Sequence, residues 1–81
     1  MNTYKILLAD DHKIVRDGII ALLEDDEKYN IIGEAENGLV ALEFIKNTVV
    51  DILIIDLNMP KMSGIDTIKK LRENYSDLKI L

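Results

Sequence analysis

Short apolar segments alternate with amphipathic segments along the whole chain. Apolar residues dominate residues 5–9, 29–35, 49–55 and 77–81, as they do in buried strands. Between these segments, apolar positions recur every three or four residues at 13–25, 37–46 and 65–74. That spacing indicates helices with one buried face. The pattern therefore predicts the order β-α-β-α-β-α-β.

The predicted buried faces of the helices share this helical spacing. They comprise Val15, Ile19, Leu22 and Leu23 in the first helix, Ala41, Leu42 and Ile45 in the second, and Ile65, Ile68 and Leu71 in the third. Asp11 or His12 is expected to cap the first helix, and Ser63 with Asp66 resembles a capping box for the third. Gly18 costs about 1 kcal/mol inside a helix, so close packing against the sheet is expected there.

Regular alternation of strands and helices is typical of a parallel sheet with right-handed crossovers. The third strand is apolar on both faces, as expected for a central strand that is covered by helices on both sides. The fold class predicted by this pattern is α/β. The chain has 81 residues, enough for one small domain.

Composition excludes several classes of protein. The formal net charge of -5, from 15 acidic and 10 basic residues, argues against a nucleic-acid-binding surface in this segment. With no cysteine, neither a disulfide framework nor a thiolate metal site is available. We see no signal peptide, and no apolar run approaches the roughly 18 residues of a membrane span, so a cytoplasmic location is expected.

Acidic residues follow two of the predicted strands. Asp10 and Asp11 come after the first strand, and Asp56 comes after the third. The carboxyl ends of parallel strands form one edge of a sheet, where ligands bind, so these three carboxylates are expected to lie together. Carboxylates that are close favour a hard divalent cation such as Mg²⁺. Asp56 in such a site is a candidate nucleophile for phosphorus.

Several motifs together resemble the receiver domain of bacterial two-component response regulators. They are Ile6-Leu7-Leu8-Ala9-Asp10-Asp11-His12, Gly33-Glu34-Ala35, Asn37-Gly38, and Asp56-Leu57-Asn58-Met59-Pro60 with Ser63-Gly64. The positions of His12, Arg16 and Gly18 are most similar to the subfamily with a C-terminal LuxR-type helix-turn-helix. The resemblance implies a flavodoxin-like (CheY-like) fold with strand order 2-1-3-4.

The resemblance also implies roles for individual residues. Asp56 matches the phospho-accepting aspartate, Asp11 the direct metal ligand, and Asp10 the acid that holds the metal through water. Asn58 matches the position whose backbone carbonyl binds the metal. The residues that match the loop-shaping positions are Pro60 and Gly64. The implied cofactor is Mg²⁺ or Mn²⁺.

The family further implies a partner and a reaction. A sensor histidine kinase would present a phosphohistidine, Asp56 would attack it, and an acyl phosphate would form, which the domain itself hydrolyses. Lys13 and Arg16 on the first helix are candidate contacts for the kinase. In a longer parent protein, phosphorylation would control transcription through a C-terminal DNA-binding domain.

The chain departs from the family pattern at its C-terminal side. The family completes the site with a hydroxyl residue after the fourth strand and a lysine after the fifth, whereas this chain ends at Leu81. Lys79 lies within the fourth strand and is no substitute. We therefore interpret residues 1–81 as the N-terminal part of one receiver domain, without its output domain and impaired in switching. The fourth strand is expected to be an exposed edge that causes self-association or exchange of elements.

Two other functions remain as alternatives. A receiver-like interaction module would have the same fold but would never take phosphate. A haloacid-dehalogenase-like phosphatase also has a nucleophilic aspartate after a buried strand, but it needs a second aspartate two residues later. Here that position is Asn58, which does no acid–base chemistry.

Overall fold

The computed structural model describes residues 3–81, and its elements follow the predicted β-α-β-α-β-α-β order. The elements are β1 (Tyr4–Ala9), α1 (Lys13–Leu23), β2 (Tyr29–Ala35), α2 (Gly38–Asn47), β3 (Ile52–Ile55), α3 (Gly64–Asn74) and β4 (Lys79–Ile80). All strand pairs are parallel, and the strand order is β2-β1-β3-β4. The predicted flavodoxin-like topology is therefore confirmed.

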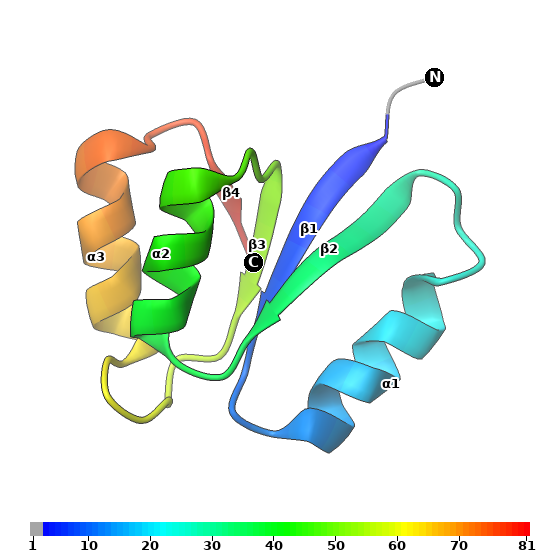
Figure 1. The fold of residues 1–81 in the computed structure, drawn as a ribbon, viewed down its shortest axis with the longest axis horizontal. Coiled ribbons are helices and arrows are strands. Elements are labelled where there is room, and N and C mark those ends of the chain that lie inside the picture. Colours follow the sequence, from blue (N-terminus) through cyan, green and yellow to red (C-terminus); the bar gives the residue numbers. More distant parts are fainter. Residues whose placement is uncertain (1–2) are drawn as a thin grey trace.

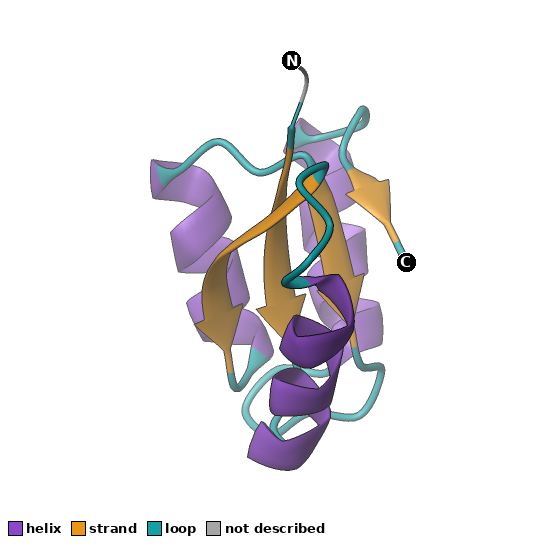
Figure 2. Ribbon diagram, turned by 90° about the vertical axis from the view of Figure 1, so that its right-hand side faces the viewer, coloured by secondary structure: helices purple, strands orange, loops and turns teal. Residues whose placement is uncertain are grey.

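The sheet has α1 on one face and α2 with α3 on the other (Figures 1 and 2). Side chains alternate along the central strands between two apolar clusters. On the α1 face, the buried cluster consists of Ile6, Leu8 and Ile52. On the opposite face, the larger cluster includes Leu7, Ala9 and Leu53. The central strands are thus apolar on both faces, as the sequence predicted.

Two strands are shorter than the sequence suggested. β3 begins at Ile52 rather than at residue 49; just before it, the N–H of Lys5 in β1 donates to the side chain of Asp51 at 2.8 Å, and the backbone ladder stops there. Val49 is 70% exposed. β4 comprises only Lys79–Ile80, although the N–H of Leu81 still donates to the carbonyl of Leu53 at 2.9 Å. Strand length here is set by the partner strand, which a single segment does not reveal.

The predicted inward face of α1 is partly wrong. Ile19 and Leu23 pack against the sheet, but Val15 is 42% exposed and Leu22 is 82% exposed. None of the described residues 13–23 is buried. The face that meets the sheet is formed by Ile19, Ile20 and Leu23, and at about 3.6 residues per turn Val15 and Leu22 project to the side of it.

Gly18 does not pack closely against the sheet. A Cβ at this position would find no heavy atom of the described residues within 4 Å. The buried face predicted for α3 from helical spacing is wrong at one position: Ile65 is 51% exposed, and Thr67 is fully buried instead. In α2 the predicted face is correct, with Ala41 and Ile45 buried.

The helix starts are specified locally. Asn37 is the N-cap of α2, and its side chain accepts a hydrogen bond from the N–H of Val40 at 2.9 Å. Ser63 caps α3 by accepting from the N–H of Asp66 at 3.1 Å, as predicted. For α1 the N-cap is His12, whose side chain makes no capping hydrogen bond. His12 is thus one of the two residues expected at the cap, but it occupies the N-cap by position alone and supplies no side-chain capping hydrogen bond.

The pairing of β1 with β2 contains an irregularity. Ile6 is opposite Ile31, but Leu7 is opposite Gly33, so β2 has one extra residue between these pairs. Such a bulge reverses which face the following side chains point to. Ile31 packs on the α1 face, and Gly33, two residues later, faces Phe44 of α2.

Among the described residues, no helix is both long enough and apolar enough to cross a membrane.

Candidate phosphoacceptor and metal site

The acidic residues singled out from the sequence lie at one edge of the sheet. Asp10 and Asp11 follow β1, and Asp56 follows β3 in the neighbouring position. Backbone hydrogen bonds extend the sheet to these residues. The N–H of Asp10 donates to the carbonyl of Ala35, and the N–H of Asp56 donates to the carbonyl of Ala9, each at 2.9 Å. The carboxylates therefore start from backbone positions that are fixed by the sheet.

The three carboxylates and the ring of His12 form one cluster. One potential ligand atom from each of these residues lies within 4.8 Å of the others. The side chains of Asp10 and Asp11 are 15% and 32% exposed, whereas the ring of His12 is 62% exposed. This set of carboxylate oxygens suits a hard cation such as Mg²⁺ or Mn²⁺, which binds oxygen ligands. The donor chemistry thus fits the metal that the sequence predicted.

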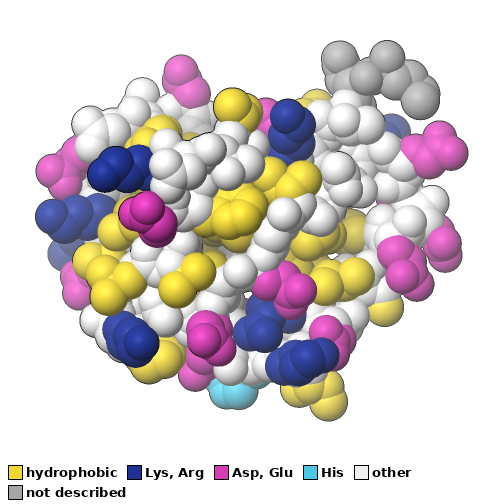
Figure 3. Space-filling view, in the orientation of Figure 1, with side chains coloured by type: hydrophobic (Ala, Val, Ile, Leu, Met, Phe, Trp, Pro, Cys, Tyr) yellow, Lys and Arg dark blue, Asp and Glu magenta, His cyan; other side chains and the backbone are white. Residues whose placement is uncertain are grey.

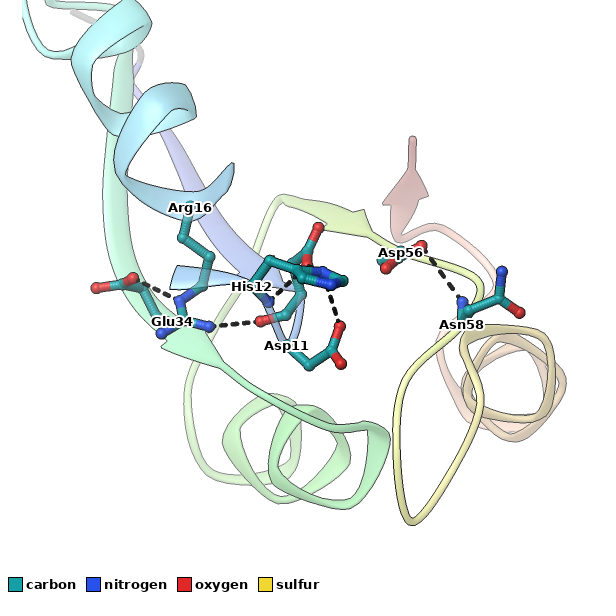
Figure 4. A network of polar contacts seen from close by, with 7 residues as sticks. Asp11, His12, Arg16, Glu34, Asp56 and Asn58 are labelled. Carbon is teal, nitrogen blue, oxygen red and sulfur yellow. Dashed lines mark hydrogen bonds and ion pairs between the residues drawn. The ribbon is translucent and has the colours of Figure 1, made fainter. Parts of the chain in front are cut away.

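His12 is held within this cluster. Its Nδ1 lies 2.9 Å from Oδ1 of Asp10 and 3.0 Å from Oδ1 of Asp11 (Figure 4). The backbone N–H of His12 also donates to Oδ1 of Asp10 at 2.8 Å. The hydrogen bond to Asp10 and the nearby charge of Asp11 raise the pKa of His12 above its usual 6.5. From the sequence, His12 was interpreted mainly as a helix-start residue; it also contacts the acidic cluster.

The loop after β3 is shaped by backbone contacts. Oδ1 of Asp56 accepts a hydrogen bond from the N–H of Asn58 at 3.3 Å, and Asn58 lies exposed beside it (Figure 4). The N–H of Gly64 donates to the carbonyl of Leu57 at 2.9 Å, which closes the loop. A Cβ on Gly64 would lie 2.6 Å from Cα of Leu57, so only glycine fits without displacement.

The same loop contains two further constraints. The carbonyl of Pro60 accepts from the N–H of Met62 at 2.7 Å, which forms a tight turn around Lys61. Lys61 has a φ of 66°, in the left-handed region that non-glycine residues rarely adopt. The carbonyl of Met62 then accepts from the N–H of Gly38 at 3.2 Å. This bond links the loop to the start of α2.

Arg16 contacts the site from α1, a contact that the sequence analysis missed. Its Nε donates to Oε1 of Glu34 at 2.8 Å, and its Nη1 donates to the backbone carbonyl of Asp10 at 2.5 Å (Figure 4). The side chain is only 13% exposed. Arg16 was predicted as a candidate kinase contact, but its guanidinium is engaged inside the molecule. Lys13 is 77% exposed and bonds Asp17 at 2.8 Å.

Three comparisons with known proteins agree on one family. Residues 6–81 match the family model described as the response regulator receiver domain. The chain is 46% identical over 71 residues to the transcriptional regulatory protein YdfI of Bacillus subtilis, covering 88% of this chain and 33% of that protein. It is 36% identical over 76 residues to the response regulator UvrY of Escherichia coli, covering 94% and 35%.

Solved structures give the same result. The RcsB response regulator of Salmonella typhimurium superimposes with a TM-score of 0.91 at 35% identity, covering 99% of this chain and 42% of that one. The isolated receiver domain of RcsB, determined with a beryllofluoride phosphate mimic, gives a TM-score of 0.90 at 34% identity, covering 98% and 59%. The chain spans about a third of the length of the curated relatives it matches. With its fold, its acidic edge and these relatives, the chain belongs to the response regulator receiver domain family.

Proposed function

We propose that Asp56 accepts a phosphoryl group from a sensor histidine kinase in the presence of a divalent cation. The observation that carries this proposal is the cluster of Asp10, Asp11 and Asp56, whose ligand atoms lie within 4.8 Å of one another. Asp56 is half-buried at the end of a central strand, so its carboxylate is rigidly supported yet reachable. Attack by a positioned carboxylate oxygen on phosphorus is a known route of covalent catalysis.

The residues present divide into metal ligands and a nucleophile. Asp11 and Asp56 would bind Mg²⁺ directly, Asp10 would hold it through water, and the backbone carbonyl of Asn58 would complete the protein ligands. When bound, the ion would neutralise the negative charge of the phosphoryl oxygens. An oxygen of Asp56 forms the new bond to phosphorus while the bond to the histidine nitrogen breaks, and the imidazole leaves with the electron pair. Gly64 keeps the loop beside Asp56 closed.

In a longer parent protein, we propose that this reaction controls transcription. Relatives of about three times this length are named as transcriptional regulators, and one structure similar to this chain is a complex of RcsB with DNA. On this view, residues 1–81 are the N-terminal part of a cytoplasmic receiver domain. DNA would be bound by a separate C-terminal domain, consistent with the acidic net charge of -5 here.

A direct test uses beryllofluoride as the phosphate mimic. Amide shifts of the chain are followed by NMR with Mg²⁺ alone and then with Mg²⁺ and beryllofluoride. We expect shifts around Asp56, Asp11 and Asn58 that are lost in Asp56→Asn. The matched control is Asp77→Asn, an exposed carboxylate that precedes β4 at the opposite end of the sheet. This control should respond like the wild type.

The two alternative functions predict other outcomes. An interaction module that never takes phosphate would show no response to beryllofluoride in the wild type. A phosphatase of the haloacid-dehalogenase type would turn over a generic phosphate monoester, and Asp56→Asn would abolish that turnover. Asn58 supplies no general acid, which speaks against the phosphatase, and the clustered carboxylates of Asp10, Asp11 and Asp56 support metal binding rather than a module that never takes phosphate.

We also propose that the 81-residue chain self-associates through β4. The N–H groups of Lys79 and Leu81 both point toward β3. The N–H of Ile80 therefore faces the other edge of β4, where no described strand pairs with it. A cavity of about 630 Å³ on the α1 face reaches this edge and is lined mainly by apolar residues, including Leu81, which is 69% exposed. Figure 3, in the orientation of Figure 1, shows exposed hydrophobic side chains in the middle of the view, between α1 on the right and α2 with α3 on the left. Unpaired apolar edges recruit further strands.

Sedimentation velocity tests this association. The wild type should form dimers or larger species at micromolar concentration, whereas Ile80→Pro should be monomeric because proline removes the outward N–H. Ile80→Val keeps the edge and serves as the control. A monomeric wild type would contradict the proposal.

A further inference from the structure

A partly buried arginine, Arg16, and an exposed glutamate, Glu34, form a clamp that reaches the backbone of the acidic loop. The guanidinium bonds Oε1 of Glu34 through Nε at 2.8 Å and the carbonyl of Asp10 through Nη1 at 2.5 Å. One planar group therefore joins α1, β2 and the segment that follows β1. The donor fork of arginine is rigid, so fixing two of its donors fixes the position of both acceptors.

The carbonyl of Asp10 belongs to the peptide bond that precedes Asp11. The orientation of this peptide sets the direction in which the Asp11 side chain leaves the backbone, because the peptide unit is planar. Within this loop, the N–H of Asp10 bonds β2 and the N–H of His12 bonds the side chain of Asp10. Arg16 is the side chain that anchors the peptide between them. Without it, this peptide would be free to rotate and Asp11 would be less ordered.

The extra residue in β2 places Glu34 where Arg16 can contact it. Ile31 and Gly33 are two residues apart, yet they face opposite sides of the sheet, because the extra residue lies between them. Glu34 consequently points to the α1 face, where Arg16 meets it (Figure 4). In a regular strand, Ile31 and Glu34 would lie on opposite faces. Bulges often re-aim a side chain beside a functional site.

We propose that Arg16 is a positioning residue for the metal loop, with Glu34 as its support. The inference rests on the proposed metal site, since its effect is exerted through Asp11. Arg16 contacts neither the metal nor the phosphoryl group in this role. It holds the peptide of Asp10 so that the carboxylate of Asp11 is preorganised for the cation. Partners of this kind that orient metal ligands typically change metal affinity by about 10–100-fold when removed.

The sign of the effect separates positioning from simple electrostatics. Arg16 is a cation near a cation site, so its charge alone opposes Mg²⁺ binding. If charge were its only influence, Arg16→Met would bind Mg²⁺ more tightly than the wild type, and Arg16→Lys would be unchanged. Positioning predicts that Arg16→Met weakens binding by about tenfold, and that Arg16→Lys also weakens it, because a lysine lacks the rigid fork.

The experiment measures Mg²⁺ affinity by NMR titration of the 81-residue chain. Wild type, Arg16→Met, Arg16→Lys and Glu34→Gln are compared with Lys13→Met, which removes an exposed charge from the same helix without touching the loop. Thermal unfolding of each variant shows whether the fold persists. Weaker binding in the three clamp variants and wild-type binding in Lys13→Met would support the proposal. Equal or tighter binding in Arg16→Met would overturn it.

A metal-free measurement keeps the inference separate from the proposed function. Backbone ¹⁵N relaxation reports the order of the Asp11 and His12 amides without any cation. The order parameters of these two amides should fall in Arg16→Met and stay unchanged in Lys13→Met. If the wild type bound no Mg²⁺, the proposed function would fail. The order parameters would still show whether Arg16 orders the peptide that precedes Asp11. Unchanged order in Arg16→Met would refute it.

Discussion

Alanine at position 64 should destabilise the domain and disturb the site, whereas alanine at position 18 should stabilise it. Gly64 is the first residue of α3 and closes the loop that follows Asp56. Its added Cβ would lie 2.6 Å from Cα of Leu57 and 2.9 Å from the carbonyl carbon of Asp56. Both neighbours are backbone atoms, so no side chain can rotate away to make room.

The magnitude follows from these distances. Carbon atoms in contact prefer a separation of about 3.5–4.0 Å, so the loop must move by about 1 Å. Forced overpacking of this kind typically costs about 1–3 kcal/mol. Replacing glycine in a helix returns at most about 1 kcal/mol. We expect Gly64→Ala to lower the free energy of unfolding by about 1–2 kcal/mol, which lowers Tm by roughly 4–16 °C in a domain of this size.

Gly18→Ala is the matched control. The same methyl group at position 18 meets no described heavy atom within 4 Å, inside an exposed part of α1. Only the helix propensity changes, so this variant should gain about 1 kcal/mol. Urea unfolding followed by far-UV circular dichroism measures both variants, with equal m-values as the check that the denatured state is unchanged.

The site provides a second observable for the same pair. Because the displaced atoms belong to Asp56 and Leu57, Gly64→Ala should shift the amides of residues 56–58 and weaken the response to beryllofluoride. Gly18→Ala should leave both unchanged. The reasoning would be refuted if Gly64→Ala were as stable as the wild type with unshifted Asp56. A loss of stability in Gly18→Ala would mean that this face of α1 is covered in solution.

Three further predictions follow from burial, charge and metal linkage. Leu53 is fully buried in β3, so Leu53→Ala should lower the free energy of unfolding by about 2–5 kcal/mol, measured in urea. The control Leu39→Ala, at a position that is 51% exposed, should change it by less than about 0.5 kcal/mol. Similar losses of stability in the two variants would contradict the observed packing. The pKa of His12 is raised by its hydrogen bond to Asp10 and then by the charge of Asp11, so this interaction stabilises the fold below pH 6.5 and is lost as pH rises through the raised value. An NMR titration of the ring should therefore give a lower pKa in Asp10→Asn, and an unchanged pKa would rule out this cause. Mg²⁺ should raise Tm, by the equivalent of about 2.7 kcal/mol at a hundredfold excess over Kd, and Asp11→Asn should abolish this rise; an equal rise in that variant would place the cation elsewhere.

Much of the fold could be predicted from the sequence because its signals are local. The apolar segments and the helical spacing gave the order of elements and the parallel α/β class. Caps such as Asn37 and Ser63 act on N–H groups within three residues, so their chemistry can be read directly. The acids that follow two strands were also informative, because the topology brings the carboxyl ends of adjacent strands together.

Other features depended on distant partners. Val15 and Leu22 have helical spacing, yet they are exposed because α1 meets the sheet through Ile19, Ile20 and Leu23 instead. The start of β3 depended on a contact with β1, where the N–H of Lys5 donates to the side chain of Asp51. Gly18 and Gly64 look alike in the sequence, but one faces open space and the other faces the backbone beside Asp56.

The sequence by itself determined which carboxylates meet at the edge of the sheet, since the three aspartates follow strand ends that periodicity reveals. Only the tertiary structure decided what holds them. The extra residue in β2 turns Glu34 toward α1, and Arg16 then reaches the carbonyl of Asp10. Local periodicity cannot encode this contact, because it depends on the register between two strands and on the position of a helix that packs across them.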